Sequence, residues 1–129
     1  MLNLSHKNLE VYKISLLFVK EVYRITKLFP KEEQFVLVTQ LRRAAISVSS
    51  NLAEGSARFS AKEKKRFYEI ARASLVEVDT QIEISFLLGY LKDVSADEFQ
   101  KYQESVFRML CKMITNLDNQ IKSAPPSSH

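Results

Sequence analysis

The residues of this sequence with the clearest chemical potential are cations gathered between positions 58 and 73, where six basic residues stand against two acidic ones, a local net charge of +4. The basic residues are Arg58, Lys62, Lys64, Lys65, Arg66 and Arg72. Ammonium and guanidinium groups bind nucleic-acid phosphates, and the nearby rings of Phe59 and Tyr68 would stack on exposed bases. We therefore predict that the six residues form a nucleic-acid-binding patch. The alternative is a solvated helix face without a ligand.

A second set of polar side chains repeats in steps of three and four residues, which places them on one face of each of two helices. Its members are Gln40, Arg43, Ser47, Asn51 and Glu54, followed by Ser74, Glu77 and Gln81. The planar guanidinium of Arg43 suits a two-pronged bond to a carboxylate. One interpretation is a polar layer between helices or subunits, with Arg43 bonded to Glu54 or Glu77; the other is two solvated faces.

Residues typical of catalysis and metal binding are scarce. His6 and His129 are the only histidines, both fall outside the predicted helices, and no Glu-x-x-His pair of a di-iron bundle occurs. Cys111 is the only cysteine, so we expect a small core hydrophobe there. Two isolated glycines cannot form a phosphate-binding loop. We expect no enzyme activity, no cofactor and no metal.

The elements that position these residues are expected to be helices. Of 129 residues, 46% are hydrophobic and only two are glycine and three proline, too few breakers for a sheet protein of this length. Apolar steps of three and four predict helices over residues 9–29, 31–55, 60–89 and 95–121. Pro30 and Gly55 serve as stops, while Ser60 and Ser95 open capping boxes. Short connections predict an all-α, antiparallel up-down-up-down four-helix bundle over residues 1–122, with a disordered C-terminal tail at 123–129.

The apolar residues predict a hydrophobic core and further apolar side chains that this core cannot bury. The second helix carries a heptad series of apolar residues, as in the seam of a helix bundle: Val38, Leu41, Ala45, Val48 and Leu52. The first helix has a wide apolar face. Together with Phe35, Phe86 and Tyr90, it presents more apolar surface than the core of one bundle can bury, so we expect a homo-oligomer. No segment approaches the roughly 18 apolar residues of a membrane span, and no leader segment is evident. We expect a cytoplasmic protein without a membrane partner.

Three blocks of the sequence resemble one known family: FPKEE at 29–33, QLRRAA at 40–45 and NLAEG at 51–55. With the later residues 66–77, they resemble the four-helix bundle family named for the 23S rRNA intervening-sequence protein. They are also similar to the accessory variability protein of diversity-generating retroelements. The resemblance implies a homopentamer with a basic surface that associates with structured RNA or RNA/DNA, or with a reverse-transcriptase-like partner. Ser49 stands where many relatives carry proline, so a kink in the second helix is less expected here.

These observations lead to two functional hypotheses. The first is a non-enzymatic, oligomeric RNA-binding or ribonucleoprotein scaffold module, which the basic segment and the resemblance both favour. The second is a protein–protein interaction bundle without nucleic-acid binding, in which the basic segment meets an acidic partner. Salt-dependent binding to structured RNA would favour the first.

Overall fold

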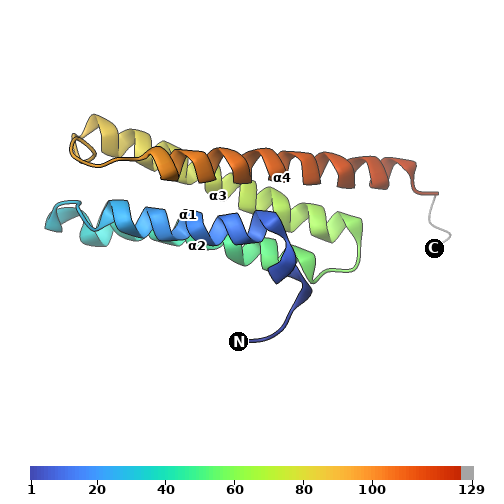
Figure 1. Ribbon diagram of the computed structural model, residues 1–129. Helices are drawn as coiled ribbons and strands as arrows, with labels where there is room; N and C mark the ends of the chain where they lie inside the picture. The colour runs from blue at the N-terminus through green and yellow to red at the C-terminus, as the bar shows by residue number, and fades with distance from the viewer. Residues whose placement is uncertain (126–129) are drawn as a thin grey trace.

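The computed structural model describes residues 1–125, and this part of the chain folds into a bundle of four long helices with no strand (Figure 1). The helices are α1 (Glu10–Thr26), α2 (Thr39–Ser56), α3 (Ala61–Leu87) and α4 (Asp97–Ser123). A short turn, η1 (Ser5–Asn8), precedes α1, and η2 (Lys31–Glu33) and η3 (Gln34–Val38) join α1 to α2. The all-α, four-helix prediction is confirmed. Of the predicted tail, Ser123 belongs to α4, and 126–129, including His129, lie outside the described residues.

All four helices contribute to one continuous core. Phe18 of α1, Leu41 and Leu52 of α2, Leu75 of α3 and Leu110 of α4 are almost completely buried. The heptad seam predicted for the second helix is buried at every position. Burying each large apolar side chain contributes about 1.5–3 kcal/mol, so this shared core aligns the helices and fixes their outer faces.

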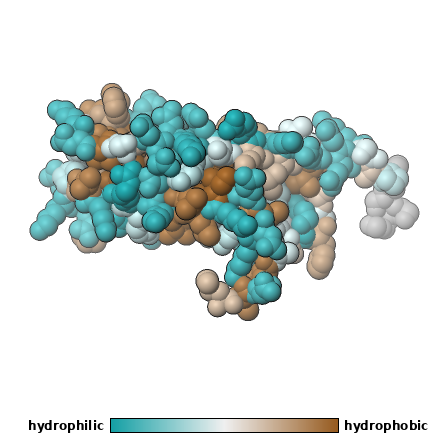
Figure 2. All heavy atoms as spheres, in the orientation of Figure 1, coloured by the Kyte–Doolittle hydropathy of each residue, from teal (hydrophilic) through white to brown (hydrophobic). Residues whose placement is uncertain are grey.

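The bundle surface is mostly polar but carries apolar side chains as well. Figure 2 shows one face, on which hydrophobic residues gather near the middle of the bundle and near the N-terminus. Phe35 and Phe86 were expected from the sequence to remain outside the core, and they are 86% and 71% exposed. Among the described helices, none is long and apolar enough to cross a membrane.

The connection between α1 and α2 differs from the prediction of a single break at Pro30. α1 ends at Thr26, and η2 is a 3-10 turn followed by the π-helical turn η3. The Thr39 hydroxyl donates to the Gln34 carbonyl five residues earlier, at 2.7 Å. This side-chain bond stabilises the wider turn, so regular α-helix begins only at Thr39. Ser49 lies within α2, which runs unbroken to Ser56.

Gly55 does not end the second helix, as the sequence suggested, but lies inside α2 against α3. A Cβ atom at this position would lie 2.6 Å from Cε1 of Tyr68. Glycine is therefore required for close approach of the two helices and not for a left-handed turn. The predicted cap of the third helix is confirmed, because the Ser60 hydroxyl accepts the Glu63 amide proton at 3.1 Å.

The connection between α3 and α4 begins with Gly89, whose φ of +82° ends α3. The Tyr90 amide donates to the Ser85 carbonyl and the Gly89 amide to the Phe86 carbonyl, both at 3.0 Å, which is a Schellman ending. The predicted capping box at Ser95 is wrong. Ala96 is the N-cap of α4 and makes no side-chain bond, so α4 starts without a side-chain cap.

Candidate nucleic-acid interface

The six predicted cations lie around the start of α3 but do not share one face. Lys62 and Arg66 stand one turn apart and are both exposed, and neither forms an ion pair within residues 1–125. Arg58, in the preceding connection, pairs with Glu54 at 3.0 Å, and its guanidinium carbon lies 4.7 Å from the Phe67 ring centre. Lys62 and Arg66 thus face solvent, whereas Arg58 is half-buried, and its buried Nε has no hydrogen-bond partner within residues 1–125.

Two further cations are used for internal packing. The Lys64 ammonium donates to the carbonyl of Ser56 at 3.2 Å, at the negative end of the α2 dipole. The Arg72 guanidinium donates to Sγ of Cys111 at 3.7 Å across α3 and α4. Cys111 is half-buried at this contact, not in the core as the sequence suggested. Both cations help to join neighbouring helices.

Lys65 joins α3 to α4 through an ion pair with Asp118, whose carboxylate lies 2.6 Å from the lysine ammonium. The hydrogen bond between them raises the pKa of Lys65 and lowers the pKa of Asp118. Both side chains are partly exposed, at 27% and 37%, so the pair is screened by water and contributes little stability.

The two aromatic residues expected to stack on bases have different environments. Phe59 lies at the tip between α2 and α3 and is fully exposed. Tyr68 is 5% exposed, packs against Gly55, and its hydroxyl lies 3.2 Å from that of Ser56. The stacking prediction is therefore wrong for Tyr68, because helix contact and not RNA occupies its ring, while Phe59 is available.

Polar residues on α2 and α3 meet in a row of hydrogen bonds. The Ser74 hydroxyl donates to that of Ser47 at 2.9 Å, and the Asn51 amide donates to the Ser47 carbonyl at 2.8 Å. Farther along, the Gln81 amide donates to the Gln40 side-chain oxygen at 3.3 Å. Within residues 1–125, the buried Oε1 of Gln81 has no donor. The structure thus joins α2 and α3 through Ser47 with Ser74 and Gln40 with Gln81. Asn51 bonds only within α2.

The ionic part of that arrangement differs from the expectation. Arg43 is exposed and pairs with neither Glu54 nor Glu77 within the described chain. Glu54 instead pairs with Arg58, and Glu77 accepts the Gln81 amide at 3.2 Å. Arg43 and Glu54 lie three helical turns apart on α2, too far for contact within one helix.

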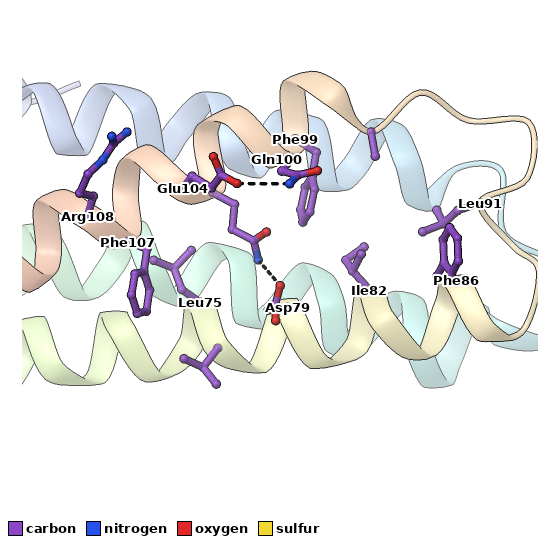
Figure 3. A pocket seen from close by; sticks show the side chains of 13 residues that line it. Leu75, Asp79, Ile82, Phe86, Leu91, Phe99, Gln100, Glu104, Phe107 and Arg108 are labelled. Atoms are coloured by element: carbon purple, nitrogen blue, oxygen red, sulfur yellow. Dashed lines mark hydrogen bonds between the residues drawn. The ribbon is translucent and has the colours of Figure 1, made fainter.

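An apolar groove of about 820 Å³ lies between α3 and α4 (Figure 3). Buried Phe99 lines it, while Phe86 and Phe107 remain 71% and 40% exposed. A hydrogen bond from Gln103 of α4 to Asp79 of α3, at 3.4 Å, crosses it. The groove was not evident from the sequence, because its walls belong to two helices. Apolar residues that lie off the buried face of their helix, such as Phe107, could have indicated it.

Comparison of the sequence with known proteins identifies its family. No curated protein matches the chain. The family described as 23S rRNA-intervening sequence protein matches residues 7–112, which span α1, α2, α3 and the first part of α4. The match includes the basic start of α3 and the polar contact between α2 and α3. The chain belongs to the 23S rRNA-intervening sequence protein family.

Proposed function

We propose that the chain is a non-enzymatic, oligomeric helical-bundle protein that binds RNA and serves as a scaffold in a ribonucleoprotein. One observation carries the proposal: an exposed aromatic side chain stands among accessible cations where α2 passes into α3. We call this surface the basic tip and define it by Arg58, Phe59, Lys62 and Arg66. Phe59 is fully exposed, and Lys62 and Arg66 have no ionic partner within residues 1–125.

The chemistry of the basic tip suits single-stranded or looped RNA. Unpaired bases stack on aromatic rings, and cations bind the phosphates on either side. Lys62 and Arg66 are separated by one turn, a rise of about 6 Å along α3, so they can contact neighbouring phosphates. The Arg58–Glu54 pair is exposed, and such pairs contribute only about 0.2–1 kcal/mol. Arg58 can therefore exchange its carboxylate partner for a phosphate at small cost.

Oligomerisation is part of the proposal. Its unit is an antiparallel bundle whose helices run up-down-up-down, in keeping with the short connections between them. Phe35, Val36, Phe86 and Leu87 are more than half exposed. The bond between Tyr90 and Glu33 holds the connections near these residues together. Burial of these side chains between subunits would stabilise an oligomer. The family resemblance implies a homopentamer, in which repeated basic tips would bind one RNA multivalently.

The second candidate function is a protein–protein interaction bundle, and the groove between α3 and α4 favours it. An open apolar groove can receive an amphipathic helix from a partner. The exposed rings of Phe86 and Phe107 would supply the anchoring contacts. The two functions differ in their dependence on the basic tip, since a partner in the groove need not contact Lys62 or Arg66.

The test is RNA binding by the wild type and by the Lys62→Gln/Arg66→Gln variant at several salt concentrations. Each phosphate neutralised adds roughly 0.7–0.9 to the slope of log affinity against log salt, so the double variant should lower the slope by about 1.4–1.8. Glutamine keeps helix propensity, so the fold should be unchanged. Lys101→Gln/Lys112→Gln on α4 is the matched control, since both residues are exposed and outside the basic tip.

Three results would contradict the proposal. Equal slopes for the wild type and the Lys62→Gln/Arg66→Gln variant would show that these cations do not contact phosphate. Absence of wild-type binding to any RNA at low salt would favour the protein–protein interaction bundle. A slope lowered equally by the control pair on α4 would mean that general charge, and not the basic tip, governs binding.

A further inference from the structure

A second cationic site lies where α1 ends and α2 begins. A pocket of about 230 Å³ opens there, and its polar lining comes from Thr26, Lys27, Lys31, Gln34 and Arg42. Three of these residues are cations, and no acidic residue lines the pocket. We call it the Arg42 pocket. It is distinct from the basic tip, because Arg42 and Gly55 are separated by about 20 Å along α2.

The side chain of Arg42 is held in place by neighbours that leave its charge uncompensated. Its Nε donates to the Thr26 hydroxyl at 2.9 Å, and that hydroxyl donates to the Val22 carbonyl at 2.7 Å. The guanidinium carbon lies 4.3 Å from the ring centre of Tyr23. Within residues 1–125 no carboxylate pairs with Arg42. A stacked guanidinium with free terminal N–H groups is the geometry that binds an oxyanion through two parallel bonds.

The backbone beside Arg42 is also unusual. The π-helical turn η3 supplies Gln34 and Val38 to the pocket wall, and the Thr39 hydroxyl stabilises this turn. π-helical turns are rare and occur frequently at functional sites. The nearby acid Glu33 does not line the pocket, since its carboxylate accepts the Tyr90 hydroxyl at 2.7 Å. The local fold therefore keeps that negative charge out of the pocket.

We propose that the Arg42 pocket binds a phosphate group, either as the free anion or as a phosphate monoester. The pocket volume of about 230 Å³ is below the ~300–1,000 Å³ of sites for drug-sized ligands, which suits a small anion. The Arg42 fork and the Gln34 amide donate to the phosphate oxygens. Lys27 and Lys31, both exposed, offset its charge at the mouth of the pocket.

The direct test is an NMR titration that follows the Arg42 Nε–Hε resonance as inorganic phosphate is added at constant ionic strength. Saturable movement of this resonance, with an affinity at least tenfold greater than for acetate, is expected. Movement that is linear, or equal with chloride or acetate, overturns the proposal. A 5′-phosphorylated RNA dinucleotide and its 5′-hydroxyl counterpart then distinguish the source. Selective binding of the phosphorylated form identifies a monoester, and binding of inorganic phosphate alone identifies the free anion.

Substitutions show whether phosphate binds in the Arg42 pocket. Arg42→Lys keeps the charge but removes the fork, and phosphate affinity should fall about tenfold or more, because charge-assisted bonds to the fork are lost. Since Arg42 also packs on Tyr23, Lys27→Gln/Lys31→Gln provides a second variant at exposed positions, with a similar loss expected. Arg43→Gln is the control, because Arg43 is exposed and does not line the pocket. Unchanged phosphate affinity in the lysine double variant, or an equal loss in the control, overturns the assignment.

Discussion

Replacing Gly55 by alanine tests the close contact between α2 and α3 that positions the basic tip. The added Cβ would lie 2.6 Å from Cε1 and 2.9 Å from Cδ1 of Tyr68, and 3.1 Å from Cβ of Phe67. Favourable carbon contacts begin near 3.5 Å, so the first distance is short by about 0.9 Å. The Tyr68 ring must move or the helices must separate. Movement of the ring also disturbs the hydroxyl contact with Ser56.

The expected free-energy change combines three contributions. Overpacking costs about 1–3 kcal/mol, and loss of the hydroxyl contact about 0.5–1.5 kcal/mol. Alanine regains about 0.5–1 kcal/mol of helix stability relative to glycine. The free energy of unfolding should therefore fall by about 0.5–4 kcal/mol, and the melting temperature by about 2–16 °C. Urea and thermal denaturation followed by circular dichroism measure both quantities.

A double-mutant cycle identifies the cause. In a Tyr68→Leu background the ring edge is absent, so Gly55→Ala should there be neutral or stabilising by about 0.5–1 kcal/mol. If Gly55→Ala raises the melting temperature of the otherwise wild-type protein, the close contact between α2 and α3 is not as described. An equal destabilisation in both backgrounds would likewise refute the role of the Tyr68 ring.

Leu41→Asp should unfold the protein, since it introduces an unpaired charge at a fully buried position; retained helicity and melting temperature would place Leu41 outside the core. Arg43→Ala and Glu54→Ala should each change stability by less than about 0.5 kcal/mol and act additively, because both side chains are exposed; a coupling above that value in denaturation experiments would show a bridging partner. Lys65 lowers the pKa of Asp118, so the pair stabilises the fold above the ordinary aspartate pKa of 3.8, and this contribution is lost as pH falls through the lower folded value. Carbon-detected NMR titration should show a lowered Asp118 pKa that rises toward its ordinary value in Lys65→Gln.

The number and type of elements followed from the sequence because helix periodicity and scarce breakers act locally. Leu41 and Leu52 repeat at heptad spacing, and both are fully buried. Ser60 also capped its helix as expected, since the cap and Glu63 are three residues apart. At Ser95 the same pattern failed: its carbonyl accepts a hydrogen bond from Arg24 of α1 at 2.7 Å, and the helix starts after Ala96. The bond from Arg24 of α1 to Ser95 thus accompanies a start of α4 that differs from the predicted one.

The features that the sequence did not reveal depend on contacts between helices. Gly55 is a residue type common at helix ends, and only the position of the Tyr68 ring shows that this glycine permits close packing of α2 and α3. Tyr68 is a residue type that stacks on nucleic-acid bases, yet its ring is covered by α2. Arg42 and Arg43 are neighbours of the same type, but Arg42 stacks on Tyr23 of α1 while Arg43 faces solvent. Periodicity gives the face of a residue on its own helix but not the partner opposite it.

RNA binding through the basic tip is tested most directly by photochemical cross-linking of the wild-type protein to a structured RNA with an unpaired loop, followed by mass spectrometry of tryptic peptides. We expect the cross-link on the peptide of residues 59–62, because Phe59 is fully exposed between accessible cations. Phe59→Ala should abolish that cross-link and leave the melting temperature unchanged. Cross-links confined to peptides from the groove between α3 and α4, or no cross-link at low salt, would contradict RNA binding through the basic tip.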